Sequence, residues 1–167
     1  MIGSTVSSNP RVELMSNLTN PTLQEIYESD EYLWLEETIK LLKQHQLEDL
    51  DLKNLIEELQ DLGKRDFNQV KSLLRQIMVH LLLLKYWPEE YERNSRHWKS
   101  EVTAFRADLS DRLTTTLKNK LNQQLAEIYQ TALRIVLQKT GLSKETIPEQ
   151  CPYSFPQLLD ENWYPDD

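Results

Sequence analysis

The sequence predicts an all-α protein: a helical bundle of about four helices with one long central helix and an extended aromatic C-terminal wrap. Three observations indicate this class. Apolar residues recur every three or four positions from residue 22 onward, which is the spacing of one helix face. No segment alternates apolar and polar residues as a half-buried strand does. Only 3 Gly and 7 Pro interrupt 167 residues, so long helices are possible.

The N-terminal segment has a different composition from the rest of the chain. Residues 1–21 are rich in Ser, Thr and Asn and contain Pro10 and Pro21, so they lack the apolar side chains that a core needs. We expect residues 1–21 to form a mobile tail and residues 22–167 to form a single helical-bundle domain.

The first predicted helix begins at Ser29 or Asp30, either of which can act as N-cap, and ends near Gln46. It carries two neighbouring apolar stripes. The first stripe holds Tyr32, Leu35, Ile39 and Leu42, and the second holds Trp34, Thr38 and Leu41.

The central predicted helix follows Asp51, a good N-cap, and keeps one apolar face from Leu52 to Leu84. Gly63 costs about 1 kcal/mol against Ala in a helix, so it weakens or bends the helix without necessarily ending it. Pro88 ends the element. The face is formed by Leu52, Leu55, Ile56, Leu59, Leu62, Val70, Leu73, Leu74, Ile77, Leu81 and Leu84.

The last turns of this helix are apolar nearly all round, from Met78 to Trp87. Such a segment has to be covered on both sides. Either the C-terminal segment or a second copy of the chain can supply the cover. If the C-terminal segment does not, the candidate interface consists of Val79, Leu82, Leu83 and Tyr86.

Two further helices are predicted. One begins near Asn94 or Ser95 and ends before Thr114–Thr116, a poor helix interior in which Thr116 can cap the next helix. The other runs from about Leu117 to Thr140, where Gly141 is the natural C-terminal residue. Four later prolines forbid a long helix, but six apolar side chains predict a segment that wraps over the bundle: Tyr153, Phe155, Leu158, Leu159, Trp163 and Tyr164.

Several short motifs resemble a bacterial family, abundant in cyanobacteria, that is described as domain of unknown function number twenty-nine. They are Tyr27-x-x-Asp30-x-Tyr32-x-Trp34, Asp51-Leu52-x-Asn54-Leu55-Ile56-Glu57-Glu58-Leu59, Leu81–Leu84 after His80, Ser95-Arg96-x-Trp98, and Cys151-Pro152-Tyr153 through Leu158-Leu159-Asp160 to Pro165. The resemblance spans about residues 25–165. This chain is shorter than many relatives between the third and fourth predicted helices. The resemblance implies an all-helical domain and no established activity, so no catalytic residue is transferred.

Charge and composition narrow the function classes. The net charge is −8, with 12 acidic and 3 basic residues in 25–62 and a net charge of +5 in 63–120. An acidic chain is repelled by phosphate backbones and anionic lipid, which disfavours nucleic acid and membrane surfaces as partners. Cys151 is the only cysteine, so an intramolecular disulfide and a cysteine-based zinc site are excluded. We expect a cytoplasmic protein, because no signal-peptide pattern and no membrane-length apolar run occurs.

Four polar residues form the candidate polar cluster: Asp30, Glu58, His80 and Arg96. In the structural interpretation, His80 is a neutral core histidine, and Arg96 pairs with Asp30 or Glu58. In the functional interpretation, the four residues converge from several helices on a metal-assisted hydrolase-type site.

We expect an interaction or scaffold module without intrinsic catalysis, and we assign no catalytic residue, metal or cofactor. Its partner would be an unknown protein or a second copy in a homodimer. The hydrolase-type enzyme is the first alternative. Weak nucleic-acid binding through the basic middle of the chain is the second.

Overall fold

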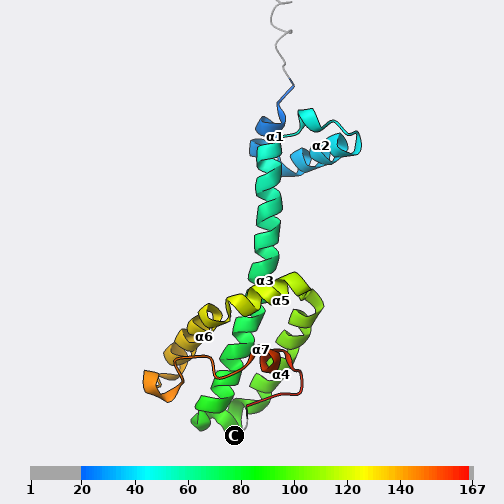
Figure 1. Cartoon of the computed structure of the whole chain (residues 1–167). Coiled ribbons are helices and arrows are strands. Elements are labelled where there is room, and N and C mark those ends of the chain that lie inside the picture. The colour runs from blue at the N-terminus through cyan, green and yellow to red at the C-terminus, as the bar shows by residue number, and fades with distance from the viewer. Residues whose placement is uncertain (1–19, 166–167) are drawn as a thin grey trace, which may run out of the picture. The chain divides into compact units, whose positions relative to one another are not determined.

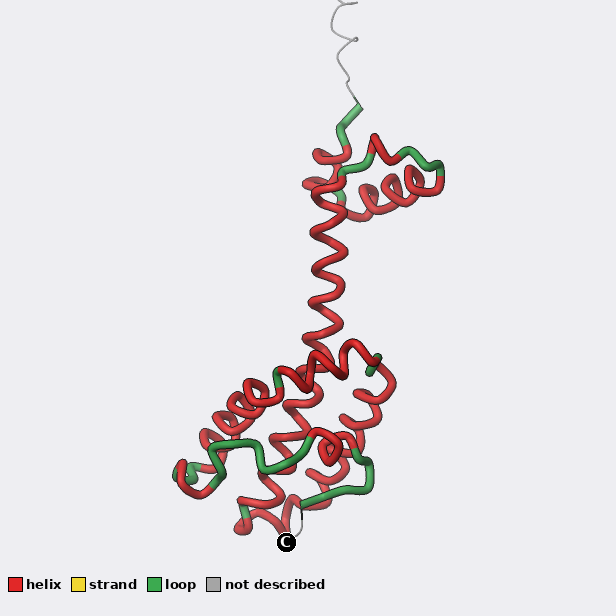
Figure 2. Tube along the Cα trace, viewed as in Figure 1, coloured by secondary structure: helices red, strands yellow, loops and turns green. Residues whose placement is uncertain are grey.

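The computed structural model describes residues 20–165, so residues 1–19 of the predicted tail lie outside it. Over the described residues the chain consists of helices and loops without a strand (Figure 2), which confirms the all-α class. The α-helices and two short 3₁₀ helices follow one another along the chain (Figure 1) as α1 (Leu23–Ser29), α2 (Glu31–Lys43), η2 (Leu47–Asp49), α3 (Leu52–Tyr86), α4 (Pro88–Arg112), α5 (Thr115–Gln123), α6 (Leu125–Thr140), η3 (Lys144–Thr146) and α7 (Phe155–Leu159).

The chain divides into two compact units, Met1–Asp61 and Leu62–Asp167, and the boundary falls inside α3. We describe each unit by itself. One domain over residues 22–167 stays a prediction. Among the described helices, none has the length and apolarity that crossing a membrane requires.

The first unit contains a helix that the sequence analysis missed. Thr22 and Glu25 form a capping box, in which each side chain accepts a hydrogen bond from the other residue's backbone, and this starts α1. Asp30 then ends α1 and caps α2 by accepting from the Leu33 N–H at 3.0 Å, as predicted. Helix α2 ends at Lys43, earlier than Gln46, because His45 adopts a left-handed backbone with φ 59°.

The boundaries of α3 agree with the sequence, but the start of α4 does not. Asp51 accepts from the Asn54 N–H at the start of α3, and Gly63 lies inside the helix. The predicted start of the next helix at Asn94 or Ser95 was wrong. Proline fits the first turn of a helix, where an N–H would be unpaired anyway, so Pro88 begins α4 directly after α3 ends.

The predicted helix from Leu117 to Thr140 is divided in two. Thr114, rather than Thr116, caps α5 by accepting from the Leu117 N–H at 3.3 Å. Helix α5 ends at Gln123, and Gln124 separates it from α6. The side chain of Gln124 accepts a hydrogen bond from Lys71. Gly141 ends α6 with φ 71°, a left-handed conformation that glycine adopts without a steric penalty.

The core of the second unit surrounds the second part of α3. In Figure 1, α4 and α6 flank this part of α3, and the C-terminal segment returns across the unit. Buried side chains from all four segments join in one cluster, which includes Leu74, Ile77, Leu81, Trp98, Val102, Ile128, Val136, Ile147, Phe155 and Leu158. The C-terminal segment therefore wraps over the helices as expected.

This core corrects the candidate interface. Val79, Leu82 and Leu83 are at most 4% exposed, and Tyr86 is half-buried. Residues of the C-terminal segment, such as Tyr153 and Leu158, belong to the same buried cluster. The cover that the apolar end of α3 requires thus comes from the chain itself, and Val79, Leu82 and Leu83 have no surface left for a second copy.

One buried cation fixes the C-terminal segment to α4. Arg106 is 2% exposed, and its guanidinium donates to three backbone carbonyls. These belong to Leu158 at 3.0 Å, Trp163 at 2.8 Å and Gln157 at 3.0 Å. The guanidinium also lies 5.3 Å from the centre of the Tyr164 ring. Burial lowers the pKa of Arg106, and the carbonyl oxygens stabilise its charge.

We expect Arg106→Met to lower the free energy of unfolding by about 3 kcal/mol, because three buried carbonyls lose their donor while the apolar stem is kept. Urea titration followed by circular dichroism measures the change. Arg96→Met, at an exposed position of the same helix, is the control and should change stability by less than about 0.5 kcal/mol. Equal effects of the two substitutions would contradict the role of Arg106.

We expect Gly63→Ala to raise the free energy of unfolding by up to about 1 kcal/mol, because alanine is favoured over glycine in a helix interior. A Cβ atom at Gly63 would meet nothing within 4 Å, so the substitution creates no clash. The same urea titration measures it. A loss of stability would show that the backbone at residue 63 needs the conformational freedom of glycine.

Candidate functional site

The first unit exposes an apolar surface. Nine of its large apolar side chains are 40–71% exposed, whereas the described residues of the second unit expose two, Leu62 at 52% and Ile135 at 38%. We define the N-terminal apolar surface as the seven of these that form regular stripes on two helices. Its residues are Tyr32, Leu35, Ile39 and Leu42 on α2 and Leu52, Ile56 and Leu59 on α3.

Within the first unit, α3 is turned with its polar side inward. Asn54 is 7% exposed and donates to Asp51 at 2.6 Å, whereas Leu52 and Ile56 are 54% and 53% exposed. Asn54 lies on the opposite side of the helix from these two residues. The apolar stripe of α3 is therefore buried in the second unit and faces solvent in the first.

The interior of the first unit is small. Trp34 is the one buried apolar side chain that its described residues contain, and its ring packs edge-on against Tyr27 at 5.0 Å. Within residues 20–61, the buried Trp34 Nε1 and Thr38 Oγ1 atoms have no hydrogen-bond partner. Each buried unpaired polar atom costs about 1–3 kcal/mol. Among the described residues of the unit, one apolar side chain is fully buried and nine large ones are exposed.

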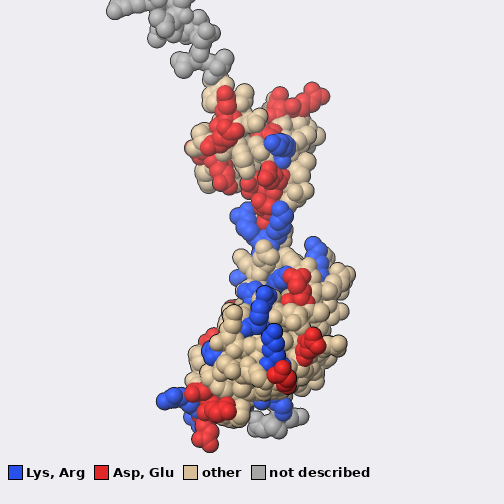
Figure 3. Space-filling model, turned by 90° about the vertical axis from the view of Figure 1, so that its left-hand side faces the viewer, with Lys and Arg blue, Asp and Glu red and all other residues tan. Residues whose placement is uncertain are grey.

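Part of the N-terminal apolar surface is hollowed. Tyr32, Leu35 and Ile39 line a groove of about 500 Å³ along α2, and its charged lining residues are Glu36, Lys40 and Lys43. On the face in Figure 3, acidic side chains gather over the first unit, but several of its acids serve local structure. Glu25, Asp30 and Asp51 accept at helix starts, Glu37 pairs with Lys40 at 3.0 Å, and Glu58 accepts from Tyr27.

Two residues of the candidate polar cluster lie in the first unit and have structural roles there. Asp30 is the exposed N-cap of α2. Glu58 is half-buried and accepts a hydrogen bond from the Tyr27 hydroxyl at 2.8 Å, which ties α1 to α3. This hydrogen bond raises the pKa of Tyr27 to about 12, so the phenol stays protonated at neutral pH.

The other two residues lie in the second unit. His80 is half-buried in α3, where its Nδ1 atom lies 2.8 Å from the Gln76 carbonyl oxygen and its ring lies 5.5 Å from that of Phe105. Nδ1 therefore carries the proton and donates it. Arg96 is exposed on α4. Convergence of all four residues on one site stays a prediction.

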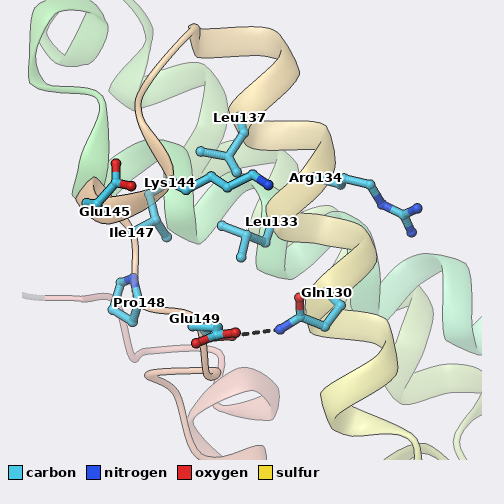
Figure 4. Close-up of a pocket in the computed structure, with 9 residues that line it drawn as sticks. All are labelled: Gln130, Leu133, Arg134, Leu137, Lys144, Glu145, Ile147, Pro148 and Glu149. Carbon is cyan, nitrogen blue, oxygen red and sulfur yellow. Dashed lines mark hydrogen bonds between the residues drawn. The ribbon is translucent and has the colours of Figure 1, made fainter.

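A second candidate site is a pocket of about 630 Å³ beside α6 (Figure 4). Leu133, Leu137 and Ile147 supply its apolar lining. Lys144 extends across the pocket towards α6, whereas Arg134 points away from it. Gln130 donates to the Glu149 carbonyl at 2.6 Å and fixes one edge. Apolar walls with rim charges of both signs do not select one class of ligand.

Two kinds of chemical group were of interest in the described part of the chain, a metal-binding cluster and the cysteine thiol. Between residues 20 and 165, no three His, Cys, Asp or Glu side chains are placed so that they could hold a metal ion. Cys151 is half-buried, and its thiol donates to the Tyr153 carbonyl at 3.3 Å. Burial raises the pKa of this thiol, which disfavours the reactive thiolate.

The sequence analysis listed every residue of the N-terminal apolar surface but did not identify the surface. It treated the α2 and α3 stripes as faces of the core, because apolar periodicity is the same for a covered and an uncovered stripe. Two features of the sequence could have indicated that these stripes are uncovered. Helix α2 carries a second stripe, which contains Trp34 and can face the interior instead. The side of α3 opposite its apolar stripe carries Asn54, which can hydrogen-bond to the N-cap Asp51 and so can be buried.

We expect stability to fall as the pH decreases below about 6.5, since burial lowers the pKa of His80 from its ordinary value of 6.5. Below 6.5 the unfolded chain binds the proton more readily than the folded chain, and this favours unfolding. Thermal melts between pH 7 and 5 measure the effect. His80→Asn should flatten the pH dependence, whereas the exposed control His45→Asn should keep it. An unchanged slope in His80→Asn would contradict the assignment.

Comparison with known proteins gives a fold relative and a family. A crystal structure of an α-helical protein of unknown function from Rhodospirillum rubrum is similar to this chain, with a TM-score of 0.58 and 24% sequence identity. The similarity covers 82% of this chain and 90% of that one, and it concerns the fold. No curated protein matches the chain. The family model described as domain of unknown function DUF29 matches residues 26–164, and the chain therefore belongs to this family.

Proposed function

We propose that this protein is a protein-interaction module that binds through the N-terminal apolar surface. The exposure of this surface is the observation that carries the proposal. Large exposed apolar areas are unusual on monomeric soluble proteins, and those that occur mark interaction sites. Stripes at helical spacing on α2 and α3 suit a partner that packs against helices.

The energetics of the first unit support the same proposal. A unit with one buried apolar side chain and two unpaired buried polar atoms gains little stability from its own interior. Covering the exposed stripes with a partner removes apolar area from water, which contributes about 25 cal/mol per Å². Binding would therefore stabilise the unit that carries the binding surface.

We expect a photo-reactive amino acid at position 39 or 56 to cross-link the protein to another polypeptide in the native cell. The same probe at position 135 should not. Ile39 and Ile135 are 41% and 38% exposed, so the two positions present similar apolar area and differ in the unit that carries them. Gel mobility and mass spectrometry report the adducts. Equal yields from positions 39, 56 and 135 would refute a specific surface.

A further inference from the structure

We infer that the N-terminal apolar surface is covered by the same surface of a second copy of the chain, in a two-fold symmetric dimer. This inference rests on the proposed function and names the partner. In a two-fold interface the same patch lies on both sides, so a surface has to be compatible with itself. Three properties of the surface meet this condition.

The first property is its chemistry. All seven of its residues are apolar, apart from one tyrosine hydroxyl, so no charged group on the surface requires an opposite charge on the partner. Two copies can therefore cover each other without burying like charges at the centre of the contact. A partner with a charged binding surface would find no opposite charge among these seven residues.

The second property is the charge around it. Residues 25–62 carry 12 acids and 3 bases, which by itself favours a basic partner. The charged side chains that line the α2 groove, however, are Glu36, Lys40 and Lys43, so the groove is not acidic. Lysine stems also cover apolar surface while the ammonium stays in water. Repulsion between two copies is thus small along the α2 groove.

The third property is its size. Seven large side chains, each 40–71% exposed, offer on the order of 500 Å² of apolar area. A standard interface buries about 800 Å² per partner, of which about 450 Å² is apolar. The α2 and α3 stripes together therefore offer the apolar area that one standard contact buries, and a second copy supplies the same two stripes.

The test measures the mass of the full chain in solution by sedimentation equilibrium over a range of concentrations. We expect twice the chain mass of 19.8 kDa for the wild type. Ile39→Glu and Ile56→Glu should each give the single-chain mass, because a carboxylate in the contact would be buried without a partner. Ile135→Glu is the matched control and should stay dimeric. Ile56→Lys repeats the test with the opposite charge, and circular dichroism confirms that each variant keeps its helices.

A second readout locates the contact. Amide hydrogen exchange in α2 and in the first turns of α3 should slow as the wild-type concentration rises. It should not slow in Ile56→Glu.

Several outcomes would overturn the dimer. They are a single-chain mass at all concentrations, dimers that persist in both glutamate variants, and masses that grow beyond two copies. If the wild type has the single-chain mass but positions 39 and 56 still cross-link to other proteins, the second copy is wrong and the proposed function stands. If the cross-links are also missing, both fail.

Discussion

The all-round apolar end of α3 is the constraint on which the second unit depends. Residues 77–79 and 81–84 are all buried, so this part of the helix needs cover on every side. Helices α4 and α6 supply two sides, and the C-terminal segment supplies the rest with Tyr153, Phe155 and Leu158. Arg106 fixes this last cover to α4, because its guanidinium donates to two carbonyls near the end of α7 and to the Trp163 carbonyl beyond it.

In the first unit, the apolar stripe of α3 is exposed instead of buried. There the inward side of α3 is polar, and Asn54 and Glu58 contact Asp51 and Tyr27, respectively. Continuation of one apolar stripe through both units is costly unless both parts are covered, since each exposed leucine forfeits part of its transfer free energy. The exposed part of the stripe, which includes Leu52, Ile56 and Leu59, therefore contributes less to the stability of the protein than the part buried in the second unit.

Much of the fold could be predicted from the sequence, and the errors have physical causes. Helix spacing, the caps at Asp30 and Asp51 and the glycine stop at Gly141 depend on local geometry, so they were recognisable. The early start of α4 was missed because Pro88 can end one helix and begin the next.

The candidate site was harder to predict because burial depends on neighbours distant in sequence. Val79 and Leu83 were as apolar as Leu52 and Ile56, and only the fold shows that the first two are covered and the last two are not. Periodicity gives the direction of a side chain around its helix, but it does not identify what lies in that direction. The hydrogen bonds of Arg106 could not be predicted either. Every residue has a backbone carbonyl, so the residue types do not show which carbonyls accept from the guanidinium.

The hydrogen bond from Arg106 to the Trp163 carbonyl also affects the order in which the second unit folds during synthesis. Its three acceptors belong to residues 157, 158 and 163, which the ribosome adds more than 50 positions after the arginine. Until then the guanidinium lacks its carbonyl partners and has to remain hydrated. Closure of the second unit is therefore a late step, completed when the chain has been made as far as Trp163, and a nascent chain halted earlier would present an open core to chaperones.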